Sequence, residues 1–255
     1  MAKYIRNLRV VENIRLQPRL FLLKLTDDIP LPAISPGQFV SVRVRTPDAF
    51  LRRPFSVHDV DVEQNQLWLL IQLVGAGTRS LAEVAPGETL DVIFPLGKGF
   101  TLTEDTDSEV LLVGGGVGIA PLLFLSRELA RKGLVPKILL GARSAQDLAQ
   151  LPLFERFGTV YIATEDGSAG EQGLVTRHTV LQTHRFDRMY VCGPLPMMKA
   201  VAQYAARQGV ACEVSLENRM ACGIGACLCC VEKTVQGHQC VCKEGPVFNI
   251  KDLLW

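Results

Sequence analysis

The cysteines of this chain constrain its fold more than any other feature. All eight lie between Cys192 and Cys242, near the C-terminal end of a 255-residue chain. Disulfides usually staple small secreted domains, whereas a chain of this length can bury a sufficient core without them. A cysteine cluster in such a chain is more typical of a metal site in a reducing compartment.

Three of these cysteines have the spacing of an iron–sulfur site. Cys222, Cys227 and Cys230 form C-x₄-C-x₂-C, and a more distant cysteine follows, which is the plant-type [2Fe–2S] pattern. The glycines and alanine between them let the backbone approach four converging thiolates and donate N–H groups to the sulfurs. Spacing alone leaves the fourth ligand open, because Cys240 and Cys242 would face the same side of an extended strand.

Zinc is the competing interpretation of the same residues. Cys227 and Cys230 form a C-x₂-C knuckle, but zinc sites usually pair two knuckles, and Cys240 and Cys242 are spaced C-x-C. Cys229 is a further thiol near the pattern. The spacing favours an iron–sulfur cluster over zinc and over unligated thiols.

Charge and hydropathy exclude several classes of function. The net charge is +1 and no basic run stands out, which argues against a nucleic-acid binder. No stretch approaches the roughly 20 apolar residues of a membrane span, and the N-terminus lacks the apolar core of a signal peptide. We expect a cytoplasmic protein. Asp147, Glu165 and Asp166 are interpreted as solvated or capping residues, so no catalytic acid or base is predicted.

The first part of the chain, residues 1–102, has the pattern of a β-barrel. Turn formers such as Pro36-Gly37 and Pro86-Gly87 separate short apolar runs, several of them alternating with period two. The predicted strands are Phe21–Leu25, Gln38–Val44, Leu67–Val74 and Leu90–Phe94. Short strands at this spacing favour a closed antiparallel barrel.

Strand and helix patterns alternate in residues 103–211, after a polar linker at Thr103–Ser108. The predicted strands are Val110–Val113, Lys137–Leu140, Val160–Ala163 and Met189–Val191, and the predicted helices are Pro121–Lys132 and Met197–Arg207. This alternation predicts a doubly wound parallel sheet. Residues 212–255 are too short for a large core of their own and are expected to form a small cysteine-rich domain.

A flavin-binding motif is predicted at the edge of the barrel. Arg53, Pro54, Phe55 and Ser56 could supply a cation for a pyrophosphate, a flat apolar surface for a ring and a hydroxyl near flavin N5. An ordinary strand end is the alternative for so short a motif. The turn containing Gly77 and Thr78 strengthens the flavin interpretation, because glycines expose backbone N–H groups and a helix beginning there would aim its positive end at phosphate.

A second glycine-rich segment lies between a predicted strand and helix, where such a loop can bind a dinucleotide. Its glycines are Gly114, Gly115, Gly116 and Gly118. The match to G-x-G-x-x-G is incomplete, and the ribose-binding acid expected after the next strand is missing. Packing of helix on sheet is the alternative role. Another loop, Cys192-Gly193-Pro194, follows a later strand and could meet a nicotinamide.

Together these motifs resemble the ferredoxin–NADP reductase superfamily, in which an FAD-binding barrel precedes a nicotinamide-binding α/β domain. Arg53–Ser56, Gly77-Thr78, Gly114–Gly118 and Cys192–Pro194 match its motifs in order. The segments 217–227 and 242–248 are similar to the electron-transfer subunits of dihydroorotate dehydrogenase B. The resemblance covers essentially the whole chain.

The resemblance implies more than spacing can show. It selects Cys242 as the fourth cluster ligand and adds Leu70, Ile71 and Gln72 to the flavin contacts. It implies FAD and a [2Fe–2S] cluster as cofactors and NAD as co-substrate. The implied partner is an FMN-containing catalytic subunit that oxidises dihydroorotate in pyrimidine synthesis, in a heterotetramer with two of each subunit. A reductase subunit of another complex, such as a hydrogenase or a bifurcating transhydrogenase, is the alternative function.

Overall fold

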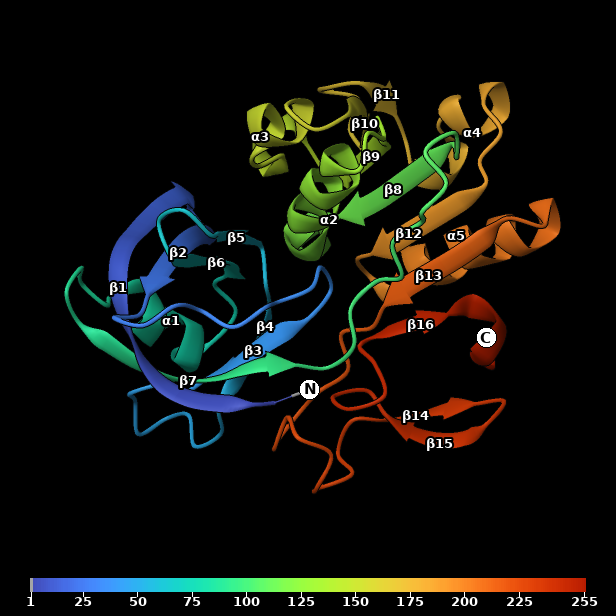
Figure 1. Ribbon diagram of the computed structural model, residues 1–255. Helices are drawn as coiled ribbons and strands as arrows, with labels where there is room; N and C mark the ends of the chain where they lie inside the picture. Colours follow the sequence, from blue (N-terminus) through green and yellow to red (C-terminus); the bar gives the residue numbers. More distant parts are fainter. Residues whose placement is uncertain (1) are drawn as a thin grey trace.

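The computed structural model describes residues 2–255. Its N-terminal part is a seven-stranded antiparallel sheet in the order β4-β3-β7-β1-β2-β6-β5. Its strands are β1 (Tyr4–Gln17), β2 (Leu20–Thr26), β3 (Phe39–Val42), β4 (Arg53–Ser56), β5 (Asp59–Asp61), β6 (Gln66–Gln72) and β7 (Thr89–Leu96). Helix α1 (Ala76–Ala82) connects β6 to β7. The sheet curls around one apolar core, which confirms the predicted barrel (Figure 1).

The longest strand of the barrel, β1, is one that the apolar pattern did not reveal. Its first half pairs with β7 and its second half with β2, with a register shift between Val10 and Glu12. Leu8 and Val10 point into the core, whereas most of the other side chains are partly or fully exposed. A strand with so few buried residues carries a weak period-two signal.

The second sheet is parallel except at one edge and has the order β11-β10-β9-β8-β12-β13-β16. Its strands are β8 (Val110–Gly115), β9 (Lys137–Ala142), β10 (Thr159–Thr164), β11 (Glu171–Gln172), β12 (Arg188–Cys192), β13 (Ala211–Ser215) and β16 (Val247–Asn249). The connecting helices are α2 (Ala120–Arg131), α3 (Leu151–Glu155), α4 (Val180–Thr183) and α5 (Leu195–Gln208), with the short 3₁₀ turns η1 (Gly116–Ile119), η2 (Ala145–Asp147) and η3 (Val175–Arg177).

Both faces of this parallel sheet are covered, as in a doubly wound fold (Figure 1). Alternate residues of β8 face opposite cores, because side chains of a strand point to its two faces in turn. Leu111 and Val113 pack with α5 in one core, and Val110 and Leu112 pack with α2 and α3 in the other. The continuous apolar run of β8 follows from burial on both faces, and the predicted α/β domain is confirmed.

The cysteine-rich end of the chain is built onto the parallel sheet. It contains the hairpin β14 (Val231–Thr234) and β15 (Gly237–Cys240), the strand β16 and a final 3₁₀ turn, η4 (Ile250–Asp252). Strand β16 pairs antiparallel with β13 and forms the edge of the sheet. Strand β13, Ala211–Ser215, spans residues 211 and 212, where the sequence predicts the boundary between the nicotinamide domain and the cysteine-rich domain.

The helices of the described chain are all short. None of those within residues 2–255 combines the length and the apolar character that crossing a membrane requires.

Candidate functional site

The predicted flavin strand, Arg53–Ser56, forms β4 at the edge of the barrel sheet. It pairs antiparallel with β3, so that Phe39 lies opposite Ser56 and Val42 lies opposite Arg53. All four side chains of β4 are partly exposed. An edge strand whose side chains are neither buried nor fully solvated presents a surface on which a flat ligand can lie.

The cation of this strand lies against the turn that begins α1. A Cβ atom added to Gly77 would stand 3.1 Å from Nε of Arg53, so the absence of a side chain lets the guanidinium approach the turn. Nη1 of Arg53 donates to the carbonyl of Leu51 at 2.7 Å. The structure thus brings together the two groups that the sequence assigned to a pyrophosphate, a guanidinium and a glycine turn.

The hydroxyl of Thr78, a predicted flavin contact, is hydrogen-bonded within its own turn. It accepts the N–H groups of Val74 at 2.9 Å and Gly75 at 3.1 Å and donates to the Gly75 carbonyl. Thr78 is only 5% exposed. Its side chain therefore holds the turn in shape, and a phosphate at this turn would meet backbone N–H groups rather than the hydroxyl.

The three predicted flavin contacts on β6 point in different directions. Ile71 is fully buried in the barrel core, Leu70 packs in the core shared with the parallel sheet, and Gln72 is exposed at the end of the strand. Ile71 could therefore reach a ligand only through its backbone. Strands β4 and β6 contact each other, so the segment lies beside the flavin strand.

The glycine loop after β8 occupies the topological switch point of the parallel sheet. From β8, the chain adds β9 and β10 on one side and then β12 and β13 on the other. Ligands of open α/β sheets bind where this order reverses, beyond the carboxyl ends of the strands. Gly114 and Gly115 end β8, Gly116 has φ of +56°, and Gly118 lies in η1.

The second predicted loop, Cys192-Gly193-Pro194, follows β12 directly across the switch point and touches the first loop. A Cβ atom on Gly118 would lie 2.4 Å from Cα of Gly193, and one on Gly193 would lie 3.1 Å from N of Gly115. Glycine at Gly118 and Gly193 therefore lets the two loops meet backbone to backbone. Cys192 is fully buried beneath them, and Pro194 is exposed.

A carboxylate that the sequence did not single out as a site residue stands beside these loops. Sγ of Cys192 donates to Oε1 of Glu217 at 3.8 Å. Burial raises the pKa of Cys192 well above its usual value, and desolvation raises the pKa of Glu217, although Glu217 keeps exposed surface. Glu217 lines a cavity of about 260 Å³ together with Pro194, Lys199 and Trp255. Cys192 adjoins this cavity through its neighbour Gly193.

The loop that carries Cys222 and Cys227 wraps backbone N–H groups around the first thiol. Ile224, Ala226 and Cys227 donate to Sγ of Cys222 at 3.5, 3.3 and 3.4 Å. Desolvation raises the pKa of Cys222, but these donors outweigh it and lower the pKa to about 6. The donors hold a thiolate, which is the form of cysteine that binds metal.

The other two predicted ligands meet on the buried side of this loop. Gly225 donates its N–H to Sγ of Cys242 at 3.0 Å, and Cys242 donates its own N–H to Sγ of Cys230 at 3.4 Å. Both thiols are nearly inaccessible, with exposed fractions of 2% for Cys230 and 1% for Cys242. Gly225 has φ of +86°, a conformation that glycine adopts without strain.

The four thiols lie near one another as two hydrogen-bonded pairs. Cys227 lies within hydrogen-bonding reach of Cys222, and Cys230 within reach of Cys242. Within residues 2–255, no three Cys, His, Asp or Glu side chains converge on a single metal position. Two thiol pairs surrounded by N–H donors fit a cluster of two irons, because four cysteines divide between them. A single zinc needs four ligands around one centre.

The cysteine loop lies directly on the barrel beside the flavin strand. A Cβ atom on Gly223 would stand 3.6 Å from Cδ1 of Leu96 and 3.7 Å from Oγ of Ser41. Ser41 lies on β3 opposite Pro54 of β4. One strand therefore separates the cysteine loop from the predicted flavin site.

Comparisons with known proteins identify the families to which this chain is similar. The family model described as the iron-sulfur cluster binding domain of dihydroorotate dehydrogenase B matches residues 217–254, and the oxidoreductase NAD-binding domain matches residues 112–203. The chain is 39% identical to the dihydroorotate dehydrogenase B (NAD(+)) electron transfer subunit of Shouchella clausii over 100% of both chains. It is 36% identical to the subunit of the same name from Fusobacterium nucleatum over 96% of both chains.

Solved structures show the same architecture. One is the NADH-dependent reduced ferredoxin-NADP oxidoreductase, whose structure gives insight into flavin-based electron bifurcation. It superposes on this chain with a TM-score of 0.87 and is 30% identical, over 97% of this chain and 90% of that one. A flavohemoglobin from Malassezia yamatoensis with bound FAD and heme shares the fold, with a TM-score of 0.71 at 22% identity over 84% and 60% of the two chains. The chain belongs to the family of dihydroorotate dehydrogenase B (NAD(+)) electron transfer subunits.

Proposed function

We propose that this chain transfers electrons from the FMN of a dihydroorotate dehydrogenase catalytic subunit to NAD⁺, using a [2Fe–2S] cluster and FAD that its own residues hold. The observation that carries the proposal is the order of three sites in space. The cysteine loop lies one strand away from β4. The glycine loop directly precedes α2, and α2 contacts the barrel where the N–H of Phe124 donates to the carbonyl of His58. When bound, FAD exchanges hydride with nicotinamide and single electrons with an iron–sulfur cluster.

Each part of the chain has a defined task in this function. Arg53 and the turn at Gly77 bind the FAD pyrophosphate, because a guanidinium and free backbone N–H groups both favour a doubly charged anion. The side chains of Pro54, Phe55 and Ser56 lie along the strand that would support the flavin ring. Leu70, Ile71 and Gln72 border it from β6.

The nicotinamide cofactor occupies the switch point in this proposal. Gly114, Gly115, Gly116 and Gly118 approach its pyrophosphate, while Cys192, Gly193 and Pro194 face the nicotinamide end. Burial raises the pKa of Cys192 well above its usual value, so Cys192 contributes a neutral thiol next to the ring, and desolvation raises the pKa of its neighbour Glu217. No residue here needs to act as an acid or base toward dihydroorotate, because that chemistry belongs to the partner.

The cluster is held by Cys222, Cys227, Cys230 and Cys242, with one thiol pair for each iron. The backbone N–H groups directed at Cys222 and Cys242 stabilise the negative charge of the ligated sulfurs. Cys242 rather than Cys240 is assigned as the fourth ligand, and the hydrogen bonds between Cys242, Gly225 and Cys230 support this choice.

The partner docks over the exposed side of the cysteine loop. Cys227 is exposed there and is flanked by two apolar side chains, Ile224 and Leu228, with exposed fractions of 43% and 65%. Arg219, also exposed, supplies a charge at the edge of this surface. Docking of an FMN-containing subunit here would bring its flavin toward the cluster, in an assembly of two copies of each subunit.

One second candidate has a specific observation in its favour. The NADH-dependent reduced ferredoxin-NADP oxidoreductase, a structure related to flavin-based electron bifurcation, has the same architecture, with a TM-score of 0.87. Identification of the partner distinguishes the two functions. Tagged protein should copurify an FMN-containing subunit that oxidises dihydroorotate, whereas a partner that reduces ferredoxin would support the second candidate.

Division of labour between the subunits gives the direct test. The purified chain should contain FAD, iron and sulfide and should oxidise NADH with an artificial electron acceptor. It should not oxidise dihydroorotate until the catalytic subunit is added. Oxidation of dihydroorotate by this chain alone would contradict the proposed function.

A further inference from the structure

One barrel residue, His58, is bonded to the first turn of α2. Its ring is fully buried, and Nδ1 lies 2.8 Å from the carbonyl oxygen of Ala120. Its own carbonyl accepts the N–H of Phe124 at 3.0 Å. In an α-helix the carbonyl of residue i and the N–H of residue i+4 bond to each other, and Ala120 and Phe124 are such a pair. His58 therefore pairs with both partners of one helical hydrogen bond.

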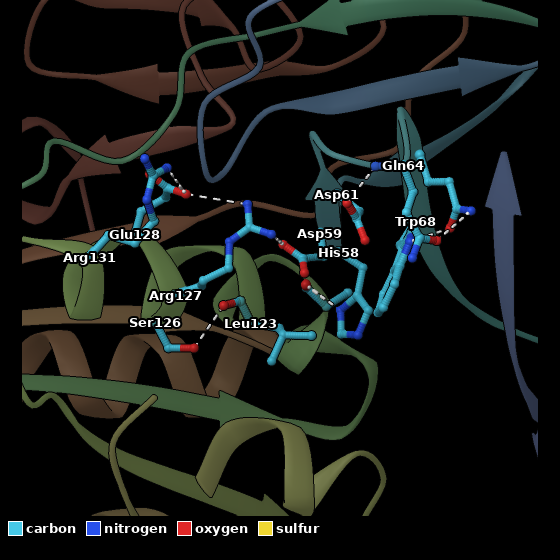
Figure 2. A network of polar contacts seen from close by, with 12 residues as sticks. His58, Asp59, Asp61, Gln64, Trp68, Leu123, Ser126, Arg127, Glu128 and Arg131 are labelled. Carbon is cyan, nitrogen blue, oxygen red and sulfur yellow. Dashed lines mark hydrogen bonds and ion pairs between the residues drawn. The ribbon is translucent and has the colours of Figure 1, made fainter. Parts of the chain in front are cut away.

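An ion pair next to this contact joins the same two elements. Oδ1 of Asp59 on β5 lies 2.7 Å from Nη1 of Arg127 on α2, and the two side chains are 10% and 19% exposed. The guanidinium carbon also stands 4.9 Å from the ring centre of Phe124. Figure 2 shows His58 and Asp59 facing α2, with Arg127 between Asp59 and Glu128.

The side chain of Phe124 completes the connection. It is 4% exposed and packs in the core of the barrel, although it belongs to a helix of the parallel sheet. The barrel and α2 thus share apolar packing, two hydrogen bonds and an ion pair within the first two turns of the helix. Such a junction holds the end of α2 in one position on the barrel.

The protonation state of His58 follows from its surroundings. Burial lowers its pKa to about 4, with the Ala120 carbonyl opposing the shift, so the ring is neutral near pH 7. Only a protonated Nδ1 can donate to a carbonyl, which leaves Nε2 as the acceptor. Nε2 has no hydrogen-bond partner among the described residues. An apolar side chain would fill the same space without burying an unpaired acceptor, so packing alone does not account for histidine here.

The junction lies between the two binding elements of the proposed function. His58 comes two residues after Ser56, the end of the flavin strand β4. Ala120 comes directly after η1, which contains Gly116 and Gly118 of the dinucleotide loop. The hydrogen bond between His58 and Ala120 therefore fixes the dinucleotide loop relative to the flavin strand. Only a few residues separate His58 from the flavin strand and Ala120 from the glycines of the loop.

We propose that His58, supported by the ion pair of Asp59 with Arg127, is a positioning residue for hydride transfer, because it sets the spacing between the nicotinamide and flavin sites. This inference rests on the proposed function. His58 touches neither cofactor in this scheme. It acts through Ala120 and the loop that precedes it.

Two substitutions of His58 separate positioning from packing. An asparagine amide can place an N–H near the position of Nδ1, whereas a glutamine amide reaches the position of Nε2 instead. We expect His58→Gln to lower the limiting rate constant of FAD reduction by NADH by about 100-fold, the effect of a misplacement of about 1 Å. His58→Asn should restore most of that rate. FAD content, iron content and the apparent Kd for NADH should change little in either variant.

The ion pair provides a second variant and a matched control. Asp59→Asn, like His58→Gln, should lower the limiting rate constant of FAD reduction by NADH. Asp27→Asn removes an ion pair with Arg6 that lies within the barrel alone. Its length of 3.0 Å and the exposed fractions of 14% for Asp27 and 19% for Arg6 are similar to those of the pair between Asp59 and Arg127. Asp27→Asn should lower the Tm without changing the rate of FAD reduction.

The measurements are anaerobic stopped-flow reduction of FAD at saturating NADH, equilibrium titration with NAD⁺, and Tm. The positioning role is overturned if His58→Gln and Asp59→Asn reduce FAD at the wild-type rate. Equal rates in His58→Asn and His58→Gln, with equal loss of Tm, would overturn it too, since packing would then be the whole role. Wild-type protein that lacks FAD, or whose FAD is not reduced by NADH, would refute the proposed function instead.

Discussion

Replacing Gly118 by alanine tests whether contact between the glycine loop and the loop after β12 determines how nicotinamide binds. The new Cβ atom would lie 2.4 Å from Cα of Gly193, 2.5 Å from its N and 2.6 Å from the carbonyl oxygen of Cys192. Ordinary van der Waals contact begins at 3.4 Å, so relief of the shortest contact requires a movement of 3.4 − 2.4 = 1.0 Å. All three neighbouring atoms belong to the backbone and cannot rotate away.

A movement of this size has two measurable consequences. Overpacking of a well-packed contact costs about 1–3 kcal/mol, and each kcal/mol lowers the Tm of a chain of this size by about 2–4 °C. Misplacement of reacting groups by about 1 Å can slow a reaction by about 100-fold. Gly118→Ala should therefore slow the reduction of FAD by NADH strongly, although the loss of Tm is modest.

The control for this experiment lies at the other end of α2. Gly133 has φ of +89° but nothing within 4 Å of its Cβ position. Gly133→Ala should cost about 1–2 kcal/mol through backbone strain and leave the two loops in contact. Stopped-flow reduction of FAD and thermal unfolding of both variants provide the comparison. Gly118→Ala with wild-type Tm and wild-type rate would refute the reasoning, and so would equal loss of rate in both variants.

Four further substitutions test the remaining sites. Cys242→Ser should lose iron and sulfide while Cys240→Ser keeps them, and the reverse result in iron and sulfide assays would transfer the fourth ligand to Cys240. Arg53→Ala should weaken FAD binding by about 10- to 150-fold, because a hydrogen bond to a charged group contributes about 1.5–3 kcal/mol; unchanged flavin retention on gel filtration would place the pyrophosphate elsewhere. Arg219→Glu should impair electron transfer with the catalytic subunit but leave NADH oxidation by an artificial acceptor intact, and a variant that couples normally would relocate the docking surface.

Local motifs predicted the parts of this molecule whose signal lies within a few adjacent residues. The helix predicted at Pro121–Lys132 is α2, and the turn before Thr78 begins α1, because proline, glycine and apolar periodicity act locally. The cysteine spacing likewise placed Cys222 and Cys227 in one loop, but it left the choice between Cys240 and Cys242 open. Strand β1 escaped prediction because it exposes most of its side chains on the surface of the barrel.

Contacts between distant segments could not be predicted in this way. Cys192 and Glu217 meet because β12 and β13 are parallel neighbours, a pairing that no short pattern specifies. His58 and Ala120 are 62 positions apart and belong to different domains. Thr78 was predicted as a flavin contact, and the sequence did not show that its hydroxyl also bonds the turn itself.

The cysteine segment is fixed to both domains, which explains how so short a segment can hold a cluster in place. Its strand β16 extends the parallel sheet, and Val241 and Phe248 join a core with Val214. On the other side, Lys98 at the end of the barrel donates its N–H to the carbonyl of Gly245 at 2.6 Å. Cys242 lies between these two attachments. Its sulfur is therefore held relative to the barrel and the parallel sheet at once, and the cluster's distance from the flavin strand does not depend on the exposed loop alone.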